Sequence, residues 1–83
     1  ATAADVNAQV LDVLTVDTFA EPSGVPAATS SLKDKINWLF MLARNKRITS
    51  GTTDKVRNDA DSADVGTAAL SDDGTNFTRG EYV

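Results

Sequence analysis

One short segment near the middle of the chain is unusually hydrophobic. Residues 38–43 read WLFMLA, six apolar residues with no polar residue between them. A helix on the surface of a folded domain usually carries one apolar stripe, because its other faces meet water. A helix that contains this run is apolar on several sides. It therefore needs partners on more than one side.

Four positions of this central helix share one face. They are spaced by four, three and four residues, which is the spacing of neighbours on one side of a helix. These four positions, called the seam below, are Leu32, Ile36, Leu39 and Ala43. Phe40 lies beside Ile36 and Ala43. The spacing predicts that the seam and Phe40 form an interface between copies of the chain.

The remaining apolar residues of the run, Trp38, Met41 and Leu42, fall on other faces of the helix. We expect these faces to meet the chain's own sheet or connector. One alternative stays open from the residues alone. In it, a single central helix is wrapped on all sides by one small monomer.

The ends of the central helix carry suitable polar residues. Any of three residues can cap its beginning: Thr29, Ser30 or Ser31. Asp34 then lies in the first turn, where a negative charge suits the helix dipole. The last turn is expected to hold three basic residues, which suit the opposite end of the dipole: Arg44, Lys46 and Arg47.

A second helical pattern precedes the central helix. In residues 5–17 the apolar side chains recur at helical spacing, and Asp5 stands where an N-cap belongs. A strand remains an alternative there, because Val, Thr and Asp alternate over residues 11–17. Residues 19–31 contain both prolines, a glycine and several Ser and Thr residues, which predicts an extended connector.

Short strands are expected after Arg47. Segments 52–58, 65–71 and 76–83 are rich in Thr, Val and aromatic residues, and the turn before the last of them contains Asp-Gly. They predict a three-stranded antiparallel meander, with a further short strand at residues 48–49 left open. The fold class is therefore α+β. The chain divides into residues 1–29, an N-terminal helix with a connector, and residues 30–83, a trimerising helix with the meander.

Composition strengthens the case for assembly. The chain has 83 residues, of which 22 are large and apolar. A domain near this size buries only about 60–65% of its unfolded surface, so folding alone is marginal. Cys and His are both absent, which removes disulfides and the common transition-metal ligands. Oligomerisation is the remaining means of stabilisation.

Charge changes sign twice along the chain. Residues 1–31 sum to −4, residues 32–47 to +4 and residues 48–83 to −4. A basic helix between acidic flanks suits pairing within or between copies. It suits nucleic acid less well, because the flanks repel phosphate. A small DNA-binding protein that uses the basic helix is thus the weaker alternative. The longest apolar run is also far below the roughly 18 residues of a membrane span.

No residues in the chain suggest catalysis or a cofactor site. The acidic loop at residues 59–64 resembles a calcium loop only superficially, because Ala63 and Leu70 replace two of the required ligands. Asp72 and Asp73 precede Gly74 and are typical of a turn. We therefore expect a protein that is not an enzyme and that needs no metal or cofactor.

Several short motifs resemble a known group of proteins. The helix INWLFMLARNKR, which contains Trp38, Leu39 and residues 44–46, is followed by the strings RNDAD at residues 57–61, SDDGT at 71–75 and FTRGE at 77–81. Together they are similar to the C-terminal part of fibre-type structural proteins of tailed bacteriophages. The upstream string EPSGVPAAT is similar to the connector before that helix. The resemblance covers roughly residues 6 to 82 and is strongest after Trp38.

The resemblance implies a parallel homotrimer on the surface of a virion, in attachment to a host or in decoration of the capsid. It brings no catalytic or cofactor residues. The expected partners are copies of the chain, other virion proteins and a host-surface receptor, without nucleic acid or membrane. The alternative is a monomeric or dimeric binding module that contacts a host receptor or another virion protein.

Overall fold

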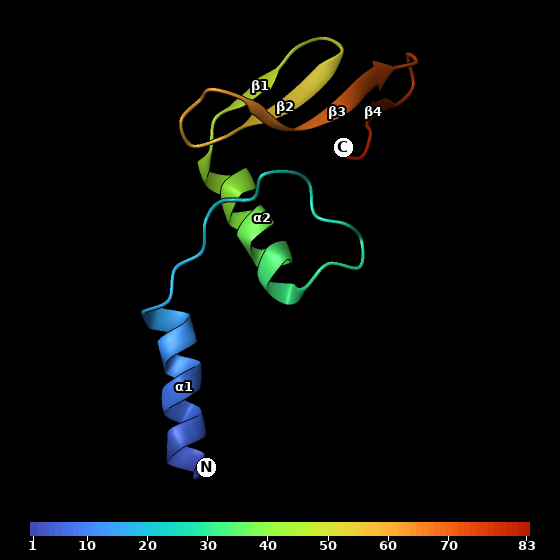
Figure 1. The fold of residues 1–83 in the computed structure, drawn as a ribbon. Helices are drawn as coiled ribbons and strands as arrows, with labels where there is room; N and C mark the ends of the chain where they lie inside the picture. Colours follow the sequence, from blue (N-terminus) through green and yellow to red (C-terminus); the bar gives the residue numbers. More distant parts are fainter.

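Two helices and a four-stranded antiparallel sheet follow one another along an elongated molecule of 60 × 28 × 17 Å (Figure 1). The structure is a computed structural model that describes residues 1–83. Helix α1 lies at one end, the sheet lies at the other, and helix α2 stands between them. The α+β class is as predicted.

Helix α1 spans Ala3–Thr15. The Thr2 hydroxyl accepts a hydrogen bond from the Asp5 backbone N–H, and the Asp5 carboxylate accepts one from the Thr2 N–H, both at 3.1 Å. This reciprocal capping box satisfies two backbone donors at the start of the helix. The prediction of a helix is confirmed and the strand alternative is wrong. Asp5 is not the N-cap but the third helical residue, because the helix begins earlier.

Helix α2 spans Leu32–Arg44 and is capped by Ser31, whose hydroxyl accepts a hydrogen bond of 3.2 Å from the Asp34 N–H. Asn45 ends the helix with an extended backbone. Of the three basic residues predicted for the last turn, only Arg44 lies there. Lys46 and Arg47 lie beyond the helix, because the chain straightens at Asn45 and enters the sheet.

The sheet has four strands in the order β1-β2-β3-β4, each antiparallel to its neighbour. Their bounds are β1 Arg47–Thr49, β2 Thr53–Arg57, β3 Asp64–Asp72 and β4 Phe77–Arg79. The prediction of three strands is wrong in its count. The further strand considered at residues 48–49 exists and begins one residue earlier. At three residues, β1 is too short to show a two-residue period by itself and depends on its pairing with β2.

The last predicted strand is shorter than expected. β4 spans Phe77–Arg79, although one strand is predicted over residues 76–83. The chain nevertheless stays beside β3, because the Gly80 N–H donates to the Ala69 carbonyl at 2.8 Å. Val83 and Thr67 then exchange two backbone hydrogen bonds of 3.0 and 3.1 Å. The C-terminal residues thus follow β3 with an interruption in the pairing.

Two turns use residues that tolerate a left-handed backbone. Gly74 has φ +88° in the β3–β4 turn, where the Asp73 carboxylate accepts hydrogen bonds from the Thr75 and Asn76 N–H groups. Asp61 has φ +54° in the β2–β3 loop. Glycine has no steric penalty at positive φ, and aspartate has a smaller one than most residues. The Asp-Gly turn is as predicted.

The interior of the chain is very small. Only 6 of 83 residues are buried, and the apolar ones with side chains are Met41, Val56, Ala68 and Leu70. Met41 comes from α2, and the others come from β2 and β3. A core of this size cannot cover the large apolar residues of both helices.

Candidate subunit interface

A buried carboxylate joins the sheet to the C-terminal residues. Asp54 on β2 is only 4% exposed, and it accepts hydrogen bonds from Arg47, from the Tyr82 hydroxyl at 2.6 Å and from the Thr49 hydroxyl at 3.1 Å. The hydrogen bonds from Tyr82 and Arg47 hold the pKa of Asp54 below its usual value. Burial raises the pKa of the Tyr82 hydroxyl. A buried charge is tolerated because these three donors surround it.

The inner face of α2 rests on this arrangement through Trp38. The Trp38 ring meets the Tyr82 ring edge to face, with centroids 5.8 Å apart. It also lies against Gly66 on β3, where an added Cβ would come within 2.9 Å of the indole and 3.0 Å of Val25. The bare backbone at Gly66 therefore lets the indole approach the sheet. Trp38 and Met41 face inward, as predicted for this side of the helix.

The connector is attached to the C-terminal end of α2. The Glu21 carboxylate accepts hydrogen bonds from the Asp59 N–H at 2.9 Å and from the Asn45 side-chain amide at 3.2 Å. The same amide donates to the Arg57 carbonyl at 3.1 Å. Asn45 thus joins the end of the helix, the connector and the end of β2. Helix α2 is thus held against the sheet at its middle by Trp38 and at its C-terminal end by Asn45.

The acidic loop forms ion pairs with the basic residues beside it. Arg44 contacts Asp59 at 2.5 Å, and Lys46 contacts Asp61 at 3.0 Å. Arg57 contacts Asp61 at 2.9 Å and Asp64 at 2.7 Å, and it lowers the pKa of both carboxylates. The loop is an exposed turn. Its carboxylates face cations of the same chain.

Because the Trp38 and Met41 side of α2 packs inward, the seam on the other side points outward. Leu32 is 74% exposed, Ile36 57%, Leu39 63% and Phe40 63%, and Ala43 is also exposed. Met41 lies on the opposite side of the helix and is 2% exposed. The chain does not wrap α2, so the alternative of a helix enclosed by its own monomer is wrong. All five residues predicted for the subunit interface lie free on one side.

Helix α1 is exposed on every side. It has no buried residue, and its apolar residues Val6, Val10, Val13 and Leu14 are 51–73% exposed. A helix of 13 residues is marginally stable in water unless its apolar face is covered. In the whole chain, 14 of the 22 large apolar side chains are exposed, so most of the hydrophobic surface has no partner within one chain.

An apolar groove lies where the end of α1 meets the outer side of α2. It has a volume of about 700 Å³, and six of its nine lining residues are apolar. These six are Val13, Leu14, Phe19, Leu32, Ile36 and Phe40. The groove therefore adjoins the seam and extends the exposed apolar surface toward α1.

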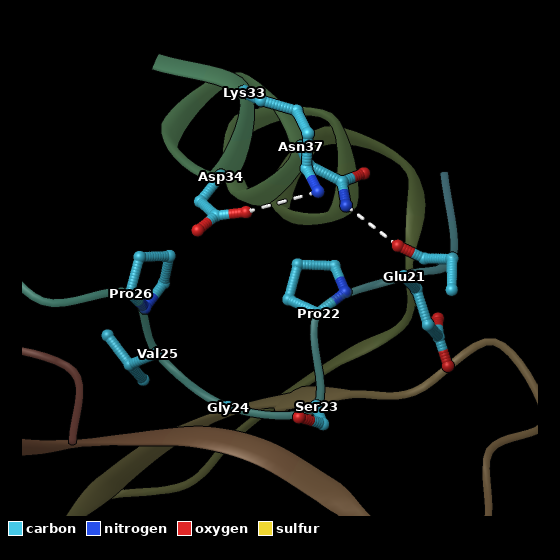
Figure 2. A pocket seen from close by; sticks show the side chains of 10 residues that line it. Glu21, Pro22, Ser23, Gly24, Val25, Pro26, Lys33, Asp34 and Asn37 are labelled. Carbon is cyan, nitrogen blue, oxygen red and sulfur yellow. Dashed lines mark hydrogen bonds and ion pairs between the residues drawn. The ribbon is translucent and has the colours of Figure 1, made fainter. Parts of the chain in front are cut away.

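A second hollow, between the connector and α2, is polar. Figure 2 shows Pro22, Gly24 and Val25 curving below the side chains of Asp34 and Asn37. The hollow measures about 390 Å³, and only two of its ten lining residues are hydrophobic. The Asn37 amide donates to the Ala20 carbonyl at 2.8 Å, which holds the connector against α2. The hollow brings together no pair of buried ionisable groups.

No group of three or more acidic, Cys or His residues is placed to hold a metal ion. Neither helix has the length and hydrophobicity that crossing a membrane requires. Comparison with known proteins finds no matching family model, no similar curated protein and no similar solved structure.

Sequence reasoning missed the residues that hold α2 against the sheet and so leave the seam exposed. The roles of Glu21, Asp54 and Tyr82 depend on long-range contacts: Glu21 binds Asp59, 38 residues away, and Asp54 binds Tyr82, 28 residues away. The alternation in β2, where Asp54 and Val56 are the two buried residues, places the carboxylate on the inner face of the sheet. The sequence signal for this site is Asp54 itself, a charged residue that shares the inward face of its strand with Val56.

Proposed function

We propose that the chain is a structural subunit of a bacteriophage fibre or spike that assembles as a homotrimer through the seam and Phe40. It has no enzymatic role in this proposal. One observation carries it: the side of α2 opposite the buried Met41 is a continuous apolar stripe that the chain leaves uncovered.

The elongated shape supports the proposal. An elongated molecule of 60 × 28 × 17 Å with only six buried residues is typical of one subunit of an assembly. A domain that is stable as a monomer usually buries a larger core. Three parallel copies would place their seams around a common axis, which is how helices with a four-three spacing pack. The sheets would then lie outside the axis, where each one could contact another virion protein or a host surface.

The charges also support assembly over nucleic-acid binding. Of the five basic residues in 32–47, Arg44, Lys46 and Arg47 pair with Asp59, Asp61 and Asp54 of the same chain. A phosphate backbone would have to compete with these carboxylates. We propose no nucleic acid and no membrane among the partners.

The experiment has two parts. Electron microscopy of the purified chain should show elongated particles with threefold symmetry. Antibodies raised against the chain should label a surface appendage on particles of the phage that encodes it. A monomeric particle, or labelling absent from intact virions, would contradict the proposal.

A further inference from the structure

We infer that α1 of each subunit docks onto α2 of a neighbouring copy, in the groove beside Phe40. This rests on the proposed assembly of copies and names a second contact within it. The seam is then covered by the α2 helices of the other subunits, and the groove is covered by a neighbour's α1.

The groove and the seam share Leu32 and Ile36, and the groove continues from there around α2 to Phe40 and Lys33. Phe40 and Lys33 lie roughly 80–100° around the helix from Leu32, because each residue advances the helix by about 100°. They line the groove together with Leu32 and Ile36. Close packing of three seams around an axis would cover Leu32 and Ile36, and the part of the groove beside Phe40 and Lys33 would stay open at the outside of the α2 bundle.

The chain's own α1 cannot fill this groove along its length. Val13 and Leu14, at the end of α1, line one end of it, and the helix then leads away from α2 (Figure 1). Val6 and Val10 lie further along α1, where they are 54% and 51% exposed. These residues continue the stripe of Val13 at helical spacing. A helix directed away from its own fold is placed to reach another copy.

The charges of the two helices favour α1 as the segment that binds in the groove. Helix α1 contains no basic residue, and Asp5 and Asp12 are seven residues apart, on one side of its stripe. Neither carboxylate forms an ion pair within the chain. On α2, Lys35 has no carboxylate partner either, and Lys33 has only the adjacent Asp34 at 3.7 Å.

These lysines flank the seam on its two sides. An α1 helix that rests between two neighbouring α2 helices would meet Phe40 and Lys33 of one and Lys35 of the other. Its acidic side would then face basic residues, while its valines cover the apolar groove. Lys33 and Lys35 are the bases of residues 32–47 available for this pairing, because Arg44, Lys46 and Arg47 already face carboxylates of their own chain.

Cysteine cross-linking tests the contact directly, because the native chain has no cysteine. One full-length variant carries Phe40→Cys, and a second carries either Val6→Cys or Val10→Cys. The two are unfolded together, refolded and oxidised. A disulfide between the two different chains is expected from at least one of the α1 positions. Ala8→Cys, on the opposite side of α1 from Val6, is the matched control and should not cross-link.

The outcomes separate this inference from the proposed assembly. A trimer mass for the unmodified chain, with no cross-link from either α1 position, overturns the inference alone. A Val10→Cys, Phe40→Cys double variant that closes its disulfide within one chain also overturns it, because α1 then folds back on its own α2. A monomer mass for the unmodified chain contradicts the assembly itself.

Discussion

The hydroxyl of Tyr82 donates a 2.6 Å hydrogen bond to the buried carboxylate of Asp54, 28 residues earlier in the chain. Arg47 binds the same carboxylate and also contacts the Tyr82 hydroxyl. The Tyr82 ring touches Trp38 of α2, so one tyrosine joins the C-terminal segment, the sheet and the helix. This connection helps to hold the Trp38 side of α2 toward the sheet.

Replacement of Tyr82 by Phe should lower the free energy of unfolding by about 1 kcal/mol, because Asp54 loses one of its donors while the ring contact remains. Urea unfolding followed by Trp38 fluorescence measures the change. Glu81→Gln, an exposed neighbour, is the control and should have little effect. Equal stability of Tyr82→Phe and the unmodified chain would show that the hydrogen bond does not contribute.

The same carboxylate makes stability depend on pH. The pKa of Asp54 is held below its usual value near 3.9, first by the Tyr82 hydroxyl and then by Arg47. A lowered folded-state pKa gives stability that is present above about pH 4 and is lost as pH falls through the folded value. Asp61, Asp64 and Asp73 have pKa values shifted in the same direction.

The chain should therefore lose stability as pH falls below about 4. Asp54→Asn should be less stable at pH 7 and should show a weaker loss on acidification. Urea midpoints across this pH range, measured for both proteins, provide the test. A variant with the same pH dependence as the unmodified chain would remove Asp54 as a contributor.

Trp38 requires the bare backbone of Gly66. Gly66→Ala would place a Cβ 2.9 Å from the indole, so the ring or the connector at Val25 must move. We expect a loss of about 1–3 kcal/mol, which is typical of overpacking. Gly24→Ala, where the added Cβ meets nothing within 4 Å, is the control. Thermal unfolding that is unchanged in Gly66→Ala would mean that Trp38 is not held against β3.

Local signals explain how much of the fold could be predicted. The Ser31 cap, the helical spacing of α1 and the Asp-Gly turn all act within a few residues, and the structure follows each of them. The sequence leaves β1 only as a possibility. Three residues are too few to show a strand pattern, and β1 forms because it pairs with β2.

Long-range contacts explain what sequence could not supply. The inward and outward sides of α2 look equally apolar in the run WLFMLA. Gly66 and Tyr82 hold Trp38 against the sheet, and the Glu21 contacts hold the end of α2, so that Leu39 faces away. The seam itself could be predicted because its spacing is regular, and its exposure in one chain is a finding of the structure.

Calcium should not stabilise the chain. Asp59, Asp61 and Asp64 already face Arg44, Lys46 and Arg57, so a cation would have to displace existing ion pairs. We expect no change of the melting temperature on adding millimolar Ca²⁺. A rise of several degrees that Asp61→Ala abolishes would instead reveal a calcium site, since a ligand that binds the folded state raises its stability.

The central claim is that the exposed seam joins copies of the chain, and the most direct test is the mass in solution. Multi-angle light scattering should give three times the 8.7 kDa mass of the chain, at both low and high salt, because apolar burial dominates the interface. Ile36→Asp and Leu39→Asp should each reduce the mass to that of a monomer, since assembly would bury an unpaired charge. Ala27→Asp adds the same charge in the exposed connector and should remain trimeric. A monomer mass for the unmodified chain, or a trimer that survives both seam substitutions, would contradict the account.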